Sequence, residues 1–423
     1  MGLFSSADID RGTRLLLKVF SRMLDESAAA SRPLPRRVLD AGSGTGVIGI
    51  CAARALMAAG LPSLKVRAQD RDDLARIFSG GNALKNSLPP ALFSAHTEPL
   101  LASAAGETWD LILSNIPAKA GRPVLEDFVP RSAGLLSPEG RALIVAVNSL
   151  ADFFRTRIKA SARLLGEEAG PEHRVFVYAP PETRPSGGAA ASFPEIRRVY
   201  LRNSGDYMME GLGYRIEALH GAAEFDRPGP AAEAAARLLC RLGPEKLFAP
   251  GPFLIHEGGQ GHFSAWLPGF LRQKALLPQA LILHGRNIIA LEAARYNTAA
   301  AYPGGETPIR IVPGMDLALD RELLSRALPG RSGREAAAYR FIAAFPEPVP
   351  QTRRYGEIWK ALEALLLPGG AALLSLPATE AERFNRNKPE GEGKSPGEGG
   401  FVCLGDLKRQ GFRAMAFRKE QRP

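Results

Sequence analysis

The sequence predicts an α/β protein with two tandem domains, each a mostly parallel sheet with helices on both faces. Two observations support this fold class. Short apolar runs alternate with helical patterns in both halves of the chain, which is typical of parallel strands joined by crossover helices. The chain also has 423 residues, more than one ordinary domain contains. We therefore expect each half to bury a core of its own.

The first half alternates strands and helices in a regular order. The expected strands are RVLDAG (37–42), LKVRAQD (64–70), ALFSAH (91–96), WDLILSN (109–115), RALIVAV (141–147) and HRVFVYA (173–179). Helical patterns over residues 45–60 and 72–86 separate the first three of these strands. This order predicts a parallel sheet flanked by helices.

A segment rich in Pro, Gly, Ala and Ser, PPETRPSGGAAASFPE (180–195), follows the last of these strands. Such a composition is typical of an interdomain linker. We predict a first domain over residues 1–182, a linker over 183–195 and a second domain over 196–423. Extended patterns over residues 200–226 open the second domain.

The second half repeats the landmarks of the first in the same order. The repeated segments are PFLIHEGGQGHFSAWLPGFL (252–271), QALILHGRNIIALEAARYN (279–297), YRFIAAFPEP (339–348) and LLLPGGAALLSL (365–376), which match residues 37–56, 64–86, 110–119 and 135–147. The second match extends to a terminal asparagine, Asn86 in one half and Asn297 in the other. Matches in a conserved order indicate an internal duplication.

The composition excludes several classes of protein. No apolar run is long enough for a membrane span, and the start of the chain lacks the features of a secretory signal. The three cysteines form no CxxC pair, which predicts a cytoplasmic protein without a structural metal. The net charge of +10 favours a polyanionic partner such as RNA. No feature of the sequence indicates the oligomeric state.

The segment VLDAGSGTG predicts a ligand-binding loop. Asp40 ends a buried strand and is followed by Gly42, Gly44 and Gly46, after which a helix begins. Glycines let the backbone turn tightly and let a ligand approach where a Cβ would stand. The same pattern also occurs in strand-to-helix turns that bind nothing, so the loop alone does not identify a ligand.

Asp70 adds a second element at the end of the second strand. A carboxylate at this place can accept hydrogen bonds from both hydroxyls of a ribose, although a lone aspartate here is more often a turn or helix-capping residue. Together with the glycine loop it predicts a ribose-containing cofactor. Nicotinamide dinucleotides and S-adenosylmethionine both fit, and Asp40 together with the later S-N-x-P strand end favours S-adenosylmethionine.

These motifs resemble the class I S-adenosylmethionine-dependent methyltransferases, and more narrowly the "methyltransferase small" family of ribosomal RNA guanine-N2 methyltransferases. The narrower resemblance is carried by LFSSADIDRGTRLLL (3–17), VLDAGSGTGVIGI (38–50), DLILSNIPAKAG (110–121) and LLSPEGRALIVAVNSLADFF (135–154). It implies tandem Rossmann-like methyltransferase domains and S-adenosyl-L-methionine as the cofactor. The implied cofactor-binding residues are Asp40, Gly42, Gly44, Gly46 and Asp70. In that family the opening segment packs over the cofactor and the loop after the fourth strand holds the target amine.

In this chain the loop that would hold the target contains Asn115, Ile116 and Pro117. The side-chain carbonyl of Asn115 and the backbone carbonyl of Ile116 can accept the two N–H groups of an exocyclic amine. The usual motif is Asn-Pro-Pro followed by an aromatic residue that stacks on a flipped base, but here Ala118 occupies the aromatic position. Phe4 or Phe153 could supply the missing ring. The alternative is that Asn115 merely caps its strand.

The second copy lacks most of the cofactor motif. Ile255 stands where the first copy has Asp40, Glu257 where it has Gly42, and Gly285 where it has Asp70. We therefore predict a degenerate domain that serves as a scaffold or in substrate recognition. Asp316, near the end of its third strand, could still contact an adenine.

The leading hypothesis is an S-adenosylmethionine-dependent N-methyltransferase that acts on an exocyclic amine of RNA, with guanine N2 of ribosomal RNA as the expected target. One alternative is methylation of a protein glutamine or a small molecule by the same loop. Another is a non-catalytic RNA-binding or assembly factor that keeps the fold. The departures from the usual motif at Ile116 and Ala118 would support this alternative. A nicotinamide-dependent dehydrogenase would need a proton donor near the sheet edge, and no histidine stands in such a place.

Overall fold

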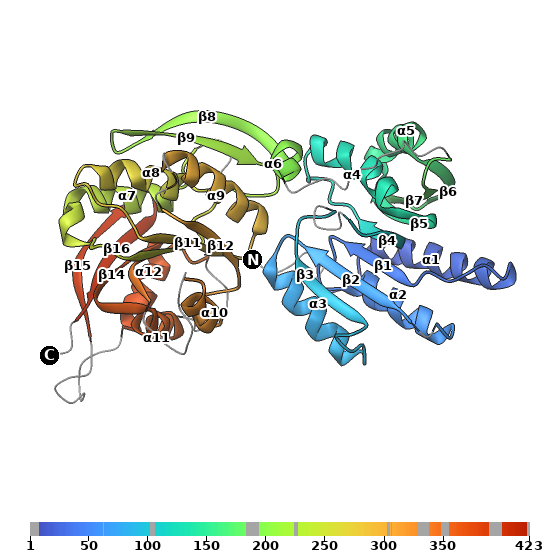
Figure 1. Ribbon diagram of the computed structural model, residues 1–423, viewed down its shortest axis with the longest axis horizontal. Helices are drawn as coiled ribbons and strands as arrows, with labels where there is room; N and C mark the ends of the chain where they lie inside the picture. Colours follow the sequence, from blue (N-terminus) through green and yellow to red (C-terminus); the bar gives the residue numbers. More distant parts are fainter. Residues whose placement is uncertain are drawn as a thin grey trace. The chain divides into compact units, whose positions relative to one another are not determined.

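The computed structural model describes residues 8–61, 63–101, 106–182, 194–223, 227–302, 305, 307–328, 338–347, 355–388 and 400–420. This part of the chain divides into two compact units, one ending at Tyr200 and the other beginning at Leu201 (Figure 1). Residues 183–193 of the predicted linker lie outside the described residues. The predicted domain limits of 182 and 196 therefore stay a prediction.

The first unit contains a seven-stranded sheet in the order β3-β2-β1-β4-β5-β7-β6. The strands are β1 (Arg37–Ala41), β2 (Lys65–Asp70), β3 (Phe93–Thr97), β4 (Trp109–Asn115), β5 (Leu136–Val147), β6 (Arg163–Ala169) and β7 (His173–Ala179). Strands β1 to β5 are parallel, and β6 and β7 pair antiparallel at one edge. The chain order reverses beside β1, which is the place where sheets of this kind bind ligands.

Helices cover both faces of this sheet (Figure 1). They are α1 (Arg11–Ala29), α2 (Val47–Ala58), α3 (Asp73–Lys85), α4 (Arg122–Leu135), α5 (Ala151–Ser161) and the short α6 (Pro194–Tyr200), with a 3₁₀ turn at Asn148–Leu150. Helices α1, α2 and α3 share one hydrophobic core, whereas α4 and α5 pack together on the opposite face. Helix α1 forms because Asp10 caps its first turn and because Leu16, Val19, Phe20 and Met23 recur on one buried face.

The strands predicted for the first half are confirmed, with two differences. Strand β5 begins at Leu136 rather than 141, because Leu136 pairs with Trp109 before an irregular stretch that returns to register at Arg141. Strand β6 was not predicted. Its sequence RLLGEEA has no continuous apolar run, because an edge strand buries little of either face.

The second unit repeats the first sheet with the order β12-β11-β10-β13-β14-β16-β15. Its strands are β10 (Pro252–His256), β11 (Ala280–Gly285), β12 (Ile309–Pro313), β13 (Tyr339–Ala344), β14 (Leu366–Pro377), β15 (Phe401–Arg409) and β16 (Phe412–Lys419). A hairpin, β8 (Leu201–Met209) and β9 (Leu212–Leu219), precedes them as a separate two-stranded sheet. The described helices are α7 (Pro230–Leu242), α8 (His262–Arg272), α9 (Ile288–Ala301), α10 (Arg321–Arg326), α11 (Tyr355–Leu365) and α12 (Ala378–Arg386), with a 3₁₀ turn at Pro244–Lys246.

Both sheets have the same strand order, so the predicted fold class of two tandem domains of one topology is confirmed. The predicted extended segment over residues 200–226 contains the β8–β9 hairpin. None of the described helices is long and apolar enough to cross a membrane.

Candidate functional site

The glycine loop joins β1 to α2 through three left-handed residues. Gly42, Gly44 and Gly46 have φ angles of 78°, 54° and 85°. A Cβ on Gly46 would lie 3.0 Å from the Cα of Ser79, whereas a Cβ on Gly44 would meet no atom of the described residues within 4 Å. Gly46 is therefore needed for close packing against α3, and Gly44 leaves open space beside the loop.

Helix α3 holds this loop in place. Ser79 Oγ donates a hydrogen bond to the carbonyl of Gly44 at 3.0 Å, and Asn82 Nδ2 donates to the carbonyl of Thr45 at 3.0 Å. In the second unit Asn297 Nδ2 donates to the carbonyl of Gln260 at 2.8 Å, directly before the corresponding glycine. The asparagine equivalent to Asn297 is thus Asn82, and the predicted match to Asn86 is wrong.

These glycines allow a prediction about stability. Alanine at either Gly44 or Gly46 places a Cβ in left-handed backbone, at a cost of about 1–2 kcal/mol. Only Gly46→Ala also forces a Cβ against the backbone of α3, which adds about 1–3 kcal/mol. We expect Gly46→Ala to lower the Tm of the first domain clearly more than Gly44→Ala does, as measured by calorimetry. Equal losses would contradict the packing argument.

Asp70 faces the glycine loop from the end of β2. Its Oδ2 accepts a hydrogen bond from the backbone N–H of Gly44 at 3.0 Å, and its Oδ1 accepts one from that of Asp72 at 3.1 Å. The N-cap of α3 is Asp72 and not Asp70. The alternative in which Asp70 caps this helix is therefore wrong. Burial raises the pKa of Asp70, although these backbone hydrogen bonds oppose the shift.

Asp40 is fully buried at the end of β1. Its Oδ2 accepts a hydrogen bond from the backbone N–H of Gly49 at 2.8 Å, and within the described part of the chain its Oδ1 has no hydrogen-bond partner. Burial raises the pKa of Asp40 to about 7, and the nearby charge of Asp70 adds to the rise. A buried carboxyl oxygen without a partner among the described residues fits a ligand that carries positive charge, as S-adenosylmethionine does at its sulfonium and its ammonium group.

Asn115 ends β4, the strand on the other side of β1. Its Nδ2 donates hydrogen bonds to Asp10 Oδ1 at 3.1 Å and to Thr13 Oγ1 at 3.2 Å. Both partners belong to the start of α1, so within the described residues the side chain of Asn115 bonds to another element and does not cap its own strand. Neither Asp10 nor Thr13 was identified from the sequence as a site residue.

The rest of this loop is held by the backbone. Ile116 is buried, and its N–H donates to the carbonyl of Val145 on β5 at 3.1 Å. Pro117 is exposed, and its carbonyl accepts a hydrogen bond from the N–H of Ala120 at 3.0 Å. The strand register places Asp40 opposite Leu113 of β4 and Ala68 of β2. Asp40, Asp70 and the target loop therefore meet at the carboxyl edge of three adjacent strands.

The two aromatic candidates for base stacking have different outcomes. Phe4 lies outside the described residues. Phe153, on α5, packs edge-on against Phe154 with ring centroids 5.2 Å apart, and the guanidinium of Arg157 lies 5.8 Å from its ring centroid. A stacking role for Phe153 therefore stays a prediction.

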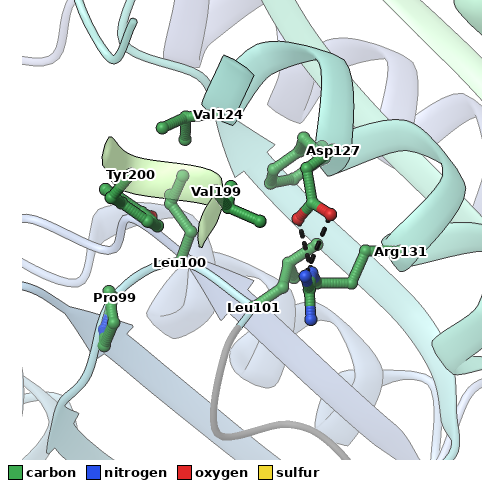
Figure 2. Close-up of a pocket in the computed structure, with 9 residues that line it drawn as sticks. Pro99, Leu100, Leu101, Val124, Asp127, Arg131, Val199 and Tyr200 are labelled. Atoms are coloured by element: carbon green, nitrogen blue, oxygen red, sulfur yellow. Dashed lines mark hydrogen bonds and ion pairs between the residues drawn. The ribbon is translucent and has the colours of Figure 1, made fainter. Parts of the chain in front are cut away.

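The first unit contains a pocket that the sequence did not reveal (Figure 2). It is lined by Pro99, Leu100, Leu101, Val124, Asp127, Phe128, Arg131, Val199 and Tyr200. Leu100 links it to the loop, because a Cβ on Gly42 would lie 3.4 Å from Leu100 Cδ2. Asp127 and Arg131 form an ion pair at its side, with Nη2 2.9 Å from Oδ1. The lining comes from the loop after β3, α4 and α6, and no local sequence pattern joins these segments.

The corresponding edge of the second unit is filled by its own side chains. Glu257 adopts a φ of 54°, and its Oε1 accepts a hydrogen bond from the N–H of Arg286 at 3.0 Å. The buried rings of His256 and His284 share a hydrogen bond of 2.9 Å, and His284 Nε2 lies 3.3 Å from Asp320 Oδ2. In the second unit, imidazoles thus lie at the ends of β10 and β11, the strands that correspond to β1 and β2 of the first unit.

The chain also covers the glycine loop of the second unit. Gln260 Oε1 accepts a hydrogen bond from the N–H of Leu219 at 2.6 Å, and Asn287 Nδ2 donates to the carbonyl of Gly221 at 2.8 Å. Asp316 Oδ1 accepts hydrogen bonds from the amides of Ala318 and Leu319, at 2.9 and 2.8 Å. These contacts favour a degenerate second domain, whereas an adenine contact by Asp316 stays a prediction.

Comparison with known proteins agrees with this description of the first unit. A parallel sheet whose switch point carries a glycine loop and a ribose-type acid is typical of a domain that binds a ribose-containing cofactor. Residues 1–159 match the family model of the methyltransferase small domain. Residues 1–159 are thus similar to this family, and S-adenosylmethionine is the methyl donor bound in the solved relative described below.

Curated relatives match part of the chain, and two of them are described here. The chain is 35% identical over 127 residues to the ribosomal protein L11 methyltransferase of Parasynechococcus marenigrum, which is 29% of this chain and 40% of the relative. It is 37% identical over 127 residues to that of Prochlorococcus marinus, which is 29% of this chain and 39% of the relative. The chain thus spans well under half the length of these relatives.

One solved structure matches along nearly the whole chain. It is the T. thermophilus 16S rRNA N2 G1207 methyltransferase in complex with AdoMet and guanosine. The match covers 99% of this chain and 94% of the methyltransferase chain, with a TM-score of 0.59. The sequence identity is 15%, so the likeness establishes a shared tandem fold.

Proposed function

We propose that the protein is an S-adenosylmethionine-dependent N-methyltransferase that acts on an exocyclic amine of RNA, with guanine N2 of ribosomal RNA as the target. One observation carries the proposal. Asp70, Asp40 and Asn115 lie at the carboxyl ends of three adjacent strands, around a glycine loop with open space at Gly44. This arrangement supports the proposed roles of Asp70 as the cofactor acid and of Asn115 as the amine acceptor at one sheet edge.

The roles of the residues follow from their chemistry. S-adenosylmethionine supplies the methyl group from a sulfonium centre when it is bound. Asp70 would accept hydrogen bonds from the ribose hydroxyls, and Gly42, Gly44 and Gly46 would let the cofactor approach the backbone. The side-chain carbonyl of Asn115 and the carbonyl of Ile116 would accept both hydrogens of the target amine, which orients its nitrogen for attack, while Pro117 stiffens the loop.

The net charge of +10 and the shared tandem fold support RNA as the substrate. A second candidate is an amino group of a protein. It is favoured by the curated relatives, which are named for ribosomal protein L11, and by Ala118, which leaves the loop without a stacking ring. In both cases we propose a cytoplasmic enzyme whose second domain serves as a scaffold or in substrate recognition.

Transfer of labelled methyl groups separates these candidates. Purified protein is incubated with methyl-labelled S-adenosylmethionine and ribosomal subunits, and RNA and protein are then separated. Label in RNA supports the proposal, and mass spectrometry of ribosomal RNA nucleosides from cells with and without the protein identifies the modified base. Label in protein alone supports the second candidate. No transfer, with cofactor binding intact by calorimetry, would leave a non-catalytic factor.

The exposed position of Ala118 allows a gain-of-function prediction. If the target is a flat base, Ala118→Phe restores a stacking ring worth about 1–3 kcal/mol, so the affinity for RNA should rise about tenfold. Filter binding with ribosomal RNA measures the effect. Ala118→Leu is the matched control, because it adds apolar area without a ring. Equal effects of Phe and Leu would count against a stacked base.

A further inference from the structure

The side-chain amide of Asn115 is held by the first turn of α1. Its Nδ2 donates to Asp10 Oδ1 at 3.1 Å and to Thr13 Oγ1 at 3.2 Å. These partners precede Asn115 by more than 100 residues, and nothing in the loop motif itself requires them. Both hydrogens of the amide are therefore used within the protein.

The charge of Asp10 fixes which end of the amide faces α1. Burial pushes the pKa of Asp10 upward, but hydrogen bonds from Thr13, Asn115 and Gly12 outweigh it and hold the pKa below its ordinary value. An ionised carboxylate can only accept hydrogen bonds, so the group of Asn115 that faces it must be the NH₂. Thr13 Oγ1 donates its own hydrogen to Asp10 Oδ2 at 2.7 Å and so presents a lone pair to Asn115.

The turn that carries these groups is tightly packed. Thr13 is 5% exposed, and the N–H of Thr13 donates to Asp10 Oδ1 at 3.0 Å as the cap of α1. A Cβ on Gly12 would lie 2.9 Å from the ring of His173, at the start of β7, and 3.1 Å from Asp10 Oδ1. Glycine at position 12 thus lets the turn lie against the sheet, within reach of β4.

We propose that Asp10 and Thr13 are positioning residues that turn the Asn115 side chain so that its carbonyl oxygen alone faces the substrate. This inference rests on the proposed function and specifies its substrate class. Among the described residues no group donates to Asn115 Oδ1, so this oxygen and the Ile116 carbonyl present two acceptors. The site therefore selects an NH₂ group and rejects a carboxylate or a ring nitrogen without hydrogen, which would leave both acceptors unpaired.

Asp10→Asn tests the inference in the full-length protein. Asparagine has the same size and caps a helix as well as aspartate does, so α1 should be kept. It can, however, donate to Asn115 and release the fixed orientation of the amide. We expect kcat to fall about tenfold with KM for S-adenosylmethionine unchanged, because only the target amine is misplaced. Thr13→Val, which removes one acceptor, should act in the same direction.

Asp8→Asn is the matched control. Asp8 is an exposed carboxylate at the same end of α1, and it pairs with Arg14 and not with Asn115. We expect its kcat to equal that of the wild type. A loss as large as that of Asp10→Asn would assign the effect to the general charge of this region and overturn the inference.

Hydrogen exchange of the Asn115 side-chain amide gives a readout that needs no substrate. Its NMR signal is assigned by its absence in Asn115→Ala. We expect exchange to become about tenfold faster in Asp10→Asn and in Thr13→Val, because each removes a hydrogen-bond acceptor. If the protein transfers no methyl group but exchange is faster in these two variants, the orientation of the Asn115 amide is supported and the proposed function fails. Unchanged exchange, or unchanged kcat in an active enzyme, would overturn the inference.

Discussion

The Asn115→Ala variant is expected to transfer methyl groups about 100- to 1,000-fold more slowly than the wild type, with unchanged affinity for S-adenosylmethionine. The substitution removes the oxygen that would accept one hydrogen of the target amine, and it removes the Nδ2 donor that Asn115 supplies to Asp10 and Thr13. Asp40, Asp70 and the glycine loop remain intact. Single-turnover transfer to ribosomal RNA at saturating cofactor measures the rate, and calorimetry measures the affinity.

Asn148→Ala is a suitable control for this prediction. Asn148 follows β5, the strand next to β4, and its Nδ2 donates to the carbonyls of Gly170 and Pro171 at 3.2 and 3.0 Å. It is thus an asparagine at a neighbouring strand end whose side-chain NH₂ holds a turn. We expect its transfer rate to stay within about threefold of the wild type. Similar losses in the two variants would point to a structural effect, and full activity of Asn115→Ala would contradict the proposed function.

The sequence was sufficient to place Asp40, Asp70 and Asn115 at one edge of a sheet. Each ends an apolar run, and the carboxyl ends of parallel strands meet at the same edge, so a strand pattern alone brings these residues together. The departures of the second copy from the cofactor motif were visible in the sequence for the same reason. Ile255, Glu257 and Gly285 could be aligned with the first copy without any knowledge of packing.

Contacts between side chains of distant elements were not predictable in this way. Asp10 was recognised only within a family-like segment, because its bond to Asn115 depends on how α1 packs against the sheet. Leu100 and Tyr200 line one pocket although 100 residues separate them, and no periodicity relates them. Asn82 was missed in favour of Asn86, because the sequence match did not identify which asparagine reaches the loop.

The affinity for S-adenosylmethionine is expected to rise as the pH rises through about 7, because Asp40 is the buried acid whose pKa lies there. Burial is the main cause of this shift, and the Gly49 hydrogen bond only partly offsets it. A cationic cofactor favours the ionised carboxylate. Below the pKa a proton must therefore leave before the charges can interact, which weakens binding by up to about tenfold per pH unit.

Asp40→Asn should remove this pH dependence and weaken cofactor binding at pH 8 by about 100-fold, as measured by calorimetry. Asparagine can still accept the hydrogen bond from Gly49 N–H, so the loop should keep its conformation. In the cofactor-free protein, folding stability depends on pH in the opposite direction to cofactor affinity. A folded-state pKa of about 7 against an ordinary value of 3.8 stabilises the protonated fold, so stability falls as the pH rises through this window in the wild type. Asp40→Asn should lack that fall. An affinity that does not change between pH 5.5 and 8 in the wild type would contradict a role for Asp40 as the counter-charge of the cofactor.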